Sequence, residues 1–363
     1  MHSLALSMSG VVYSAGCNDE GALGREATCE TECLFQPVTA LKTHKIVKVC
    51  AGDSYSAALT TEGDVYAWGL FRDVNGPIGL LDDKIKTEPT LVYRNEDVCT
   101  NIAGGNNHLI ILTSKGRIFT CGSGDAGQLG RMTERDVESR GGRKGVKSLV
   151  TPQEVFLPVK SRSKSSFGGF SKNAVKIFST KLGSFAVTLD GSVYGWGLNN
   201  NGQVYPSEED VIYHPILLKY LNSTCGLSDC NFDFVIDGGV DHTLVLNRSQ
   251  KRIFSFGSSR FGILGRYVTA TGYSEVSPEN AIKPIELDTP DVYFVDCACG
   301  DNCSHAISNR GQLYSWGMGV NNQLGVGAGE DVMVPALVKS ESLRNVKVIR
   351  VSSGSQHSAL LCC

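Results

Sequence analysis

This 363-residue chain lacks long apolar runs and a strong net charge. No run approaches the roughly 18 apolar residues that span a bilayer, and Met1–Ser14 has neither the basic start nor the apolar core of a signal peptide. A net charge of −3 gives no bulk attraction to nucleic acid, so any such contact requires a local patch. These absences argue against a membrane-spanning or secreted protein.

Metal-binding and catalytic motifs are missing as well. The 13 cysteines are odd in number, and their close spacings match no C-x2-C zinc pairing: Cys29/Cys33, Cys225/Cys230 and Cys297/Cys299/Cys303. We therefore expect buried, reduced thiols of an intracellular protein, with no metal and no cofactor. The chain also has no G-x-S-x-G elbow, P-loop or Cys/His nucleophile context, which argues against an enzyme that makes or breaks bonds.

What the chain does contain is a repeat. An aromatic residue followed by two residues and a glycine recurs six times, at Tyr13–Gly16, Tyr66–Gly69, Phe119–Gly122, Tyr194–Gly197, Phe254–Gly257 and Tyr314–Gly317. The final glycines are 53, 53, 75, 60 and 60 residues apart. This period is typical of β-propeller blades and too long for most helical solenoids.

Each repeat alternates short strand-like runs with glycine turns such as Glu62-Gly63-Asp64, and long helical stripes are absent. With 41% hydrophobic residues and 41 glycines, the chain can bury a sizeable core through short strands. Since the blades of a propeller share their faces with their neighbours, we expect one all-β domain over residues 1–363.

Both ends of the chain fall inside a repeat. His2–Leu6 matches the position of Asn107–Ile111 but lacks the preceding glycine pair, and Gly354–Leu361 begins a repeat without its aromatic strand. An open strand edge invites aggregation, so we expect the native chain to continue upstream of Met1 and to complete the closing blade. The alternative is a ring that is naturally incomplete.

The 75-residue interval locates an insertion from Arg131 to about Gly169. Arg140–Lys147 and Lys160–Lys164 make it basic and rich in glycine and serine, which predicts a long exposed loop. Either the loop is merely solvated or it binds a partner, and long insertions in compact repeats often carry function.

Several segments resemble the regulator of chromosome condensation family, whose namesake is the guanine nucleotide exchange factor for the small GTPase Ran. They are Cys17–Arg25, Ala51–Ser54, Trp68–Leu81 and Gly127–Arg131, and the resemblance spans the whole chain. The Phe-Arg-Asp-x-Asn-Gly-x-Ile insert and the Arg-Gly-Gly-Arg stretch are more specific than the repeat itself. The resemblance implies a seven-bladed β-propeller with one face for Ran and the opposite face for the nucleosome.

The resemblance also implies a β-wedge, a hairpin that pushes against the phosphate-binding region of the GTPase. It comprises Phe71, Arg72, Asp73, Val74, Asn75, Gly76, Pro77 and Ile78. Glycine permits the chain reversal at the tip and proline fixes φ, so the tip is expected to be stiff. The alternative is a decorative loop.

By the same resemblance, the GTPase-binding face includes His2, Asp53, Asn107, Arg131, Asp241 and His357. Asn107 stands where the family usually has aspartate, and Asp241 where it usually has a histidine, so exchange could be slower unless the GTPase compensates. Arg140 and Arg143 resemble the arginines that enter the acidic patch of the histone dimer. We expect the repeat histidines His108, His242 and His305 to be packing residues.

The resemblance thus predicts a nuclear, chromatin-associated monomer that promotes GDP release from Ran and docks on the nucleosome through histone and DNA, with no membrane partner. Two alternatives remain open: a scaffold propeller without exchange activity, and a chromatin-binding module without it.

Overall fold

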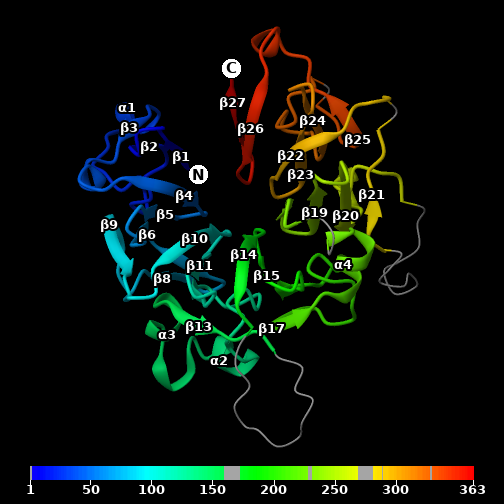
Figure 1. The fold of residues 1–363 in the computed structure, drawn as a ribbon. Coiled ribbons are helices and arrows are strands. Elements are labelled where there is room, and N and C mark those ends of the chain that lie inside the picture. The colour runs from blue at the N-terminus through cyan, green and yellow to red at the C-terminus, as the bar shows by residue number, and fades with distance from the viewer. Residues whose placement is uncertain (1, 159–171, 228–230, 269–280, 288, 328) are drawn as a thin grey trace, which may run out of the picture. The chain divides into compact units, whose positions relative to one another are not determined.

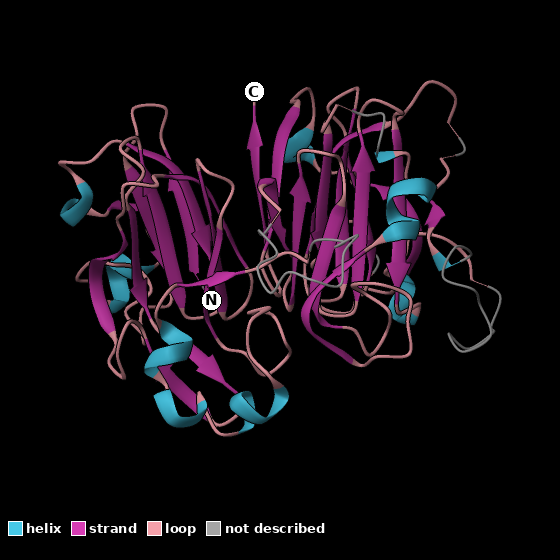
Figure 2. Cartoon of the chain, turned by 60° about the horizontal axis from the view of Figure 1, so that its bottom comes forward, coloured by secondary structure: helices cyan, strands magenta, loops and turns pink. Residues whose placement is uncertain are grey.

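The computed structural model describes residues 2–158, 172–227, 231–268, 281–287, 289–327 and 329–363. The chain divides into two compact units. One consists of Met1–Asp190, Tyr194–Gly197 and Ile212–Ile216, and the other of Gly191–Val193, Leu198–Val211 and Leu217–Cys363. Strands carry most of the regular structure and the helices are short segments in the connections (Figure 2), which confirms the all-β prediction. That all 363 residues form a single domain stays a prediction.

The repeating element is a sheet, or blade, whose strands follow one another in chain order (Figure 1). In the first unit the blades are β1-β2-β3 (His2–Leu6, Val12–Gly16, Gln36–Pro37), β4-β5-β6-β9 (Ile46–Ala51, Tyr55–Thr60, Val65–Gly69, Lys86–Tyr93) and β10-β11-β12-β13 (Cys99–Gly104, His108–Thr113, Ile118–Gly122, Gln153–Val155). The next blade is β14-β15-β16-β17 (Ala174–Ser179, Gly183–Thr188, Val193–Leu198, Val211–Leu217).

The second unit continues the pattern with β18-β19-β20-β21 (Phe234–Gly238, His242–Asn247, Arg252–Gly257, Lys283–Pro284) and β22-β23-β24-β25 (Phe294–Cys299, Cys303–Ser308, Leu313–Gly317, Val332–Leu337), followed by the pair β26-β27 (Val348–Ser353, Ser358–Cys362). The short helices are α1 (Cys29–Glu32), α2 (Glu134–Glu138), α3 (Lys147–Val150) and α4 (Lys219–Thr224), and the 3-10 turns are η1 (Thr39–Leu41), η2 (Gly142–Lys144), η4 (Arg260–Gly262) and η6 (Glu341–Leu343).

These sheets confirm the β-propeller prediction but correct the number of blades. Six sheets have three or four strands, whereas β26 and β27 form a two-stranded sheet, so the described residues contain six blades rather than seven. The physical reason is that β26 and β27 pair only with each other among the described residues, and two strands do not make a complete blade.

A repeated tie joins successive blades within each unit. The carbonyl oxygen of Ala22, in the loop after β2, accepts a hydrogen bond from Trp68 Nε1 at 2.8 Å and another from Ser56 Oγ at 2.8 Å. The same pair of bonds recurs with Gln128, Ser184 and Trp196, and with Ile263, Ser304 and Trp316. All three tryptophans are fully buried, so each tie gives an indole N–H a partner in the core.

The leucine-glycine end of these three loops is explained by the same contact. Gly24 has φ +66°, and a Cβ there would lie 2.6 Å from Trp68 Nε1. Glycine is required on both counts, because an L side chain is strained at that φ and would collide with the indole.

The repeat histidines complete the tie, which confirms their predicted packing role. His108 Nε2 lies 3.1 Å from Ser184 Oγ of the next blade, and His242 Nε2 lies 2.7 Å from Ser304 Oγ. Burial lowers the pKa of both histidines to about 3, so they are neutral at physiological pH. His305 is also buried, with ring nitrogens beside the hydroxyls of Ser315 and Ser358.

Candidate functional site

A hairpin that stands apart from the blade sheets is the most distinctive feature of the first unit. β7 (Phe71–Asp73) pairs with β8 (Gly76–Gly79), and their register opposes Phe71 to Gly79 and Asp73 to Gly76. At its base Phe71 and Ile78 are buried, and the Phe71 ring lies 4.5 Å from that of Tyr55. At its tip Val74 is 84% exposed. The predicted wedge residues therefore form a hairpin with an apolar base in the core and an exposed side chain at the tip.

Polar contacts fix the hairpin on both sides. The Arg140 guanidinium donates two hydrogen bonds to the Asp73 carboxylate, at 2.6 and 2.7 Å, and the Asp73 side chain is only 2% exposed. The backbone N–H of Val74 donates to Asp125 Oδ2 at 2.6 Å, and the Arg72 guanidinium pairs with Glu20. A planar guanidinium that engages both carboxylate oxygens sets orientation as well as distance. The hairpin is thus held in one pose.

Electrostatics at the hairpin base agree with these contacts. The hydrogen bonds from Arg140 to Asp73 raise the pKa of the Arg140 guanidinium. Partial burial raises the pKa of Asp125, and the neighbouring Asp73 carboxylate adds to that rise.

Asn107 joins the hairpin to the loop that carries Asp53. Its Oδ1 accepts from the backbone N–H of Arg72 at 3.0 Å, and its Nδ2 donates to Asp53 Oδ2 at 3.1 Å. The two neighbours fix the orientation of the amide. If it were reversed, its NH2 group would face the N–H of Arg72 and its oxygen would face the Asp53 carboxylate. An amide can satisfy both neighbours at once, whereas an aspartate here would set two carboxylates against each other. The structure brings Asp53, Asn107 and the wedge together.

Arg131 is occupied within its own blade. Its guanidinium donates to Thr120 Oγ1 and to the carbonyl oxygens of Thr120, Ser148 and Leu149, at 3.0 to 3.3 Å. Burial lowers the pKa of Arg131 to about 10. Two other arginines that follow a leucine-glycine pair make the same kind of contacts, namely Arg25 and Arg266. The repeat therefore explains Arg131 without a partner, and its place on the GTPase-binding face stays a prediction.

His2 requires a correction. It is 6% exposed, and its Nε2 lies 2.7 Å from Ser56 Oγ, so it occupies the buried position of His108 and His242 rather than an exposed partner-binding position. The sequence match aligned His2 with Asn107. The strand pairing instead opposes His2 to Gly16, as it opposes His108 to Gly122.

The remaining predicted face residues lie in the second unit. Asp241 precedes β19, is half-buried, and accepts from Asn201 Nδ2 at 3.1 Å through its Oδ1. His357 precedes β27 and is exposed, and the N–H of Gly354 donates to its carbonyl oxygen at 2.8 Å. Both residues belong to loops that enter the second strand of a sheet, as Asp53 and Asn107 do in the first unit.

The insertion is more ordered than predicted. Residues 131–158 contain α2, η2, α3 and the strand β13, and Leu149 and Val150 are buried in the core of the second and third blades. Lys160–Lys164 lie outside the described residues.

The two arginines predicted to bind the nucleosome have different surroundings. Arg140 binds Asp73 of the wedge, so the assumption that it lies on a surface remote from the hairpin is wrong. Arg143 is exposed on η2 and lines a cavity of about 980 Å³ together with Arg135, Lys144 and Phe156. A role of either arginine at the nucleosome stays a prediction.

Two contact residues were missed by the sequence analysis, Glu20 and Asp125. Both precede a leucine-glycine pair within a loop after the third strand position of a blade, in Asp19-Glu20-Gly21 and Asp125-Ala126-Gly127. An acidic residue in the corresponding loop of the first and third blades was the available signal.

Metal sites, membrane-spanning helices and cysteines are considered in turn for the described residues. The part of the chain that the structure describes holds no group of His, Cys, Asp and Glu side chains suited to a metal ion. Within it, no helix is long and apolar enough to cross a bilayer. Twelve cysteines are described, all of them free thiols; six are buried, but Cys17, Cys29, Cys33, Cys362 and Cys363 are exposed, so the expectation of buried thiols was only partly right.

Comparison with known proteins connects these features. The RCC1-like domain model matches residues 1–360. The regulator of chromosome condensation of Xenopus laevis is 40% identical over 363 residues, covering 99% of this chain and 80% of that protein. The guanine nucleotide exchange factor SRM1 of Saccharomyces cerevisiae is 29% identical, with 99% and 76% covered.

Among solved structures, that of Prp20p from Saccharomyces cerevisiae, described together with its binding properties to Gsp1p and histones, superposes with a TM-score of 0.80. It is 28% identical and covers 99% of this chain and 80% of that one. With three pairs of blades tied by the same loop carbonyl, serine and tryptophan, and with a match over 360 residues, the chain belongs to the RCC1-like domain family, among the regulators of chromosome condensation.

Proposed function

We propose that this protein is a guanine nucleotide exchange factor for the small GTPase Ran and that it docks on chromatin in the nucleus. The observation that carries the proposal is the hairpin of residues 71–79, which has an exposed tip and a base fixed by Arg140, Asn107 and Asp125. The named relatives support it, since one is an exchange factor and another was studied with Gsp1p and histones.

Exchange requires a rigid element more than a reactive one. A GTPase holds its nucleotide through backbone N–H groups, a lysine and Mg²⁺, so release requires that cradle to be displaced without hydrolysis. The exposed Val74 tip is suited to enter such a cradle, and the bonds at the hairpin base resist the reaction force. No chemical step is required of this chain.

The energetics are within reach of such a site. Accelerating release about a thousandfold needs about 4 kcal/mol of barrier lowering, at 1.36 kcal/mol per tenfold. A hairpin that is ordered before binding avoids the entropy cost of ordering several residues in the complex. By linkage, the factor weakens nucleotide binding by as much as nucleotide weakens binding of the factor.

The other contacts are assigned by their exposure. We place Asp53, Asn107, Asp241 and His357 on the GTPase-binding face, since each lies in a loop before a second strand. Arg143, exposed on the insertion, is the better candidate for the histone acidic patch, because Arg140 is bound to Asp73. We expect the protein to act as a monomer.

Replacing Arg72–Asn75 by a short Gly-Ser turn tests the proposal. Release of a fluorescent GDP analogue from Ran should fall to near the uncatalysed rate, while melting temperature changes little. Glu62→Ser, in the exposed β5–β6 turn, is the matched control and should leave release unchanged. Normal release by the hairpin variant would refute the wedge assignment. Failure of the unaltered chain to accelerate release would instead favour a scaffold or a chromatin-binding module.

A further inference from the structure

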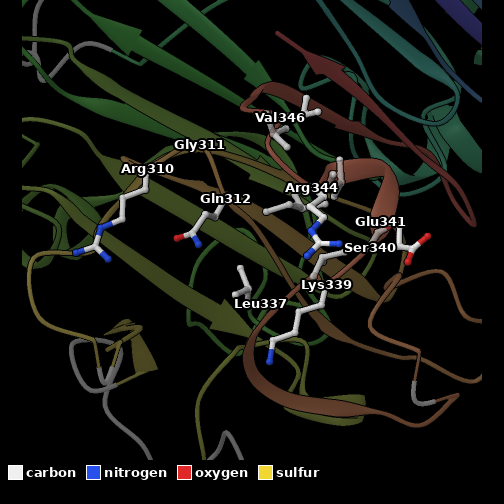
Figure 3. A pocket seen from close by; sticks show the side chains of 13 residues that line it. Arg310, Gly311, Gln312, Leu337, Lys339, Ser340, Glu341, Arg344 and Val346 are labelled. Carbon is white, nitrogen blue, oxygen red and sulfur yellow. The ribbon is translucent and has the colours of Figure 1, made fainter.

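A second candidate binding site lies in the second unit, where the turn between β23 and β24 faces the connection between β25 and β26. A cavity of about 410 Å³ opens there, lined by residues 310–313 and by parts of 337–348. Figure 3 shows Arg310 on one side of it and Lys339 and Arg344 on the other, with Leu337 between them. The cavity therefore combines a basic rim with apolar residues.

The apolar floor is preformed. Leu313, Val338, Leu343 and Val348 line the cavity and belong to, or pack on, one buried cluster of the core. Backbone hydrogen bonds fix the walls: Val338 N donates to Leu313 O at 2.9 Å, and Val348 N donates to Gly311 O at 2.9 Å. A ligand would meet a shaped surface without reorganising the sheet.

The basic rim lacks acidic partners. Among the described residues, Arg310, Lys339 and Arg344 take part in no ion pair, although other arginines of this unit do, such as Arg248 and Arg350 with Asp296. The only carboxylate that lines the cavity is that of Glu341. The rim thus offers three cations against one anion, which favours an acidic ligand by charge complementarity.

The site is separate from the face residues of the same unit. β26 runs from Val348, at the cavity, to Ser353, just before the loop of His357. Six extended residues span about 20 Å, at roughly 3.3 Å per residue. A ligand in the cavity therefore leaves the His357 loop free.

We propose that this cavity binds an acidic peptide segment of a partner protein, with an aliphatic side chain of the segment on the apolar floor and flanking carboxylates on Arg310, Lys339 and Arg344. The site is independent of the exchange function proposed above. Arginine suits the rim because its planar fork engages a carboxylate through two hydrogen bonds.

The lining favours a peptide over nucleic acid. None of the residues that line the cavity is aromatic, so bases would find no stacking surface. Phosphate contacts to the rim would also leave the apolar floor uncovered, whereas a leucine or isoleucine covers it.

The test is fluorescence anisotropy with the labelled peptide Glu-Asp-Glu-Leu-Asp-Ile-Glu-Glu and the full chain at low salt. The double variant Lys339→Glu/Arg344→Glu should weaken binding by about tenfold or more, equivalent to at least ~1.4 kcal/mol. The matched control Lys219→Glu/Lys283→Glu makes the same charge change at exposed lysines of the same unit and should alter binding by less than about twofold. A peptide with serine for leucine and isoleucine should bind at least about fivefold more weakly.

Three results would overturn the proposal. Equal losses in the two double variants would mean general charge attraction, and equal binding of the serine peptide would mean that the floor is not used. Tighter binding of a labelled oligothymidine than of the peptide, lost in Lys339→Glu/Arg344→Glu, would assign the rim to nucleic acid instead. Nucleotide release should be the same in both double variants.

Discussion

Replacing Arg140 by alanine should loosen the wedge and slow nucleotide release. The change removes two charge-assisted hydrogen bonds to Asp73, whose side chain is 2% exposed and would keep only the bond from the N–H of Asn75 at 2.8 Å. Such bonds contribute about 1.5 to 3 kcal/mol each in buried sites, but Arg140 is 36% exposed and water can replace part of its contribution. We therefore expect a local cost of about 2 kcal/mol.

This cost sets the size of the kinetic effect. At about 1.4 kcal/mol per tenfold, a loss of ~2 kcal/mol shifts the ratio of anchored to loosened hairpin about 30-fold, which bounds the fall in kcat/KM for release. Stopped-flow release of a fluorescent GDP analogue from Ran measures it. Arg143→Ala, three residues away and exposed, should change release by less than about twofold.

A double-mutant cycle isolates the pair. In an Asp73→Asn background Arg140→Ala should cost little further, because the partner charge is already gone. The reasoning fails if Arg140→Ala releases nucleotide at the normal rate and weakens nucleosome binding as much as Arg143→Ala does, since Arg140 would then serve chromatin and not the wedge.

Three further predictions address the bridge, the blade tie and the buried histidines. Asn107→Ala removes both bonds between the wedge and the Asp53 loop and should slow release about tenfold at unchanged melting temperature, worth ~1.4 kcal/mol. Gly130→Ala should lower the free energy of unfolding in urea by about 2 to 5 kcal/mol, because φ is +69° and the added Cβ would lie 2.6 Å from Trp196 Nε1. The control Gly145→Ala should lower it by about 1 kcal/mol, because φ is +64° but nothing lies within 4 Å of the added Cβ. His108 has a folded pKa of about 3, so below its unfolded pKa of about 6.5 the unfolded chain binds the proton and stability falls as pH falls. Between pH 7.5 and 5 His108 should account for a loss of about 2 kcal/mol, and His108→Gln should reduce the total loss in urea unfolding by that amount, since His242 keeps its own contribution.

The repeat was predictable because it is local. The aromatic-x-x-glycine signature and the glycine turns each act within a few residues, so they indicate strands and hairpins before any contact is known. The buried tryptophan and the glycine that packs on it also stand at fixed places within the repeat signature, as Trp68 and Gly24 show. His2 was misplaced because its loop signature is incomplete, and only the strand pairing with Gly16 fixes its register.

The anchoring of the wedge could not be predicted in the same way. Arg140 and Asp73 are 67 residues apart and belong to no common repeat position, so no periodicity relates them. The sequence shows that Asn107 lacks the charge of the family's usual aspartate. That its amide bridges Arg72 and Asp53 follows only from their positions in the structure. Non-repeating insertions pair with each other, and that pairing appears only in three dimensions.

The turn that carries Arg140 and Arg143 connects the two proposed activities, nucleotide exchange and nucleosome binding. Arg140 and Arg143 lie in a single turn, in which Gly141 N donates to Asp136 O at 2.7 Å and Lys144 N to Gly141 O at 3.2 Å, so a shift of η2 acts on both arginines. If a nucleosome binds Arg143 without moving this turn, the rate of nucleotide exchange on chromatin equals the rate in solution. If the turn moves, the Asp73 contact changes with it, and linkage requires the GTPase to alter nucleosome affinity by the same factor. Nucleosome affinity measured with and without nucleotide-free Ran distinguishes the two cases, and Arg140→Ala should abolish any difference, because it cuts the connection between the turn and the wedge.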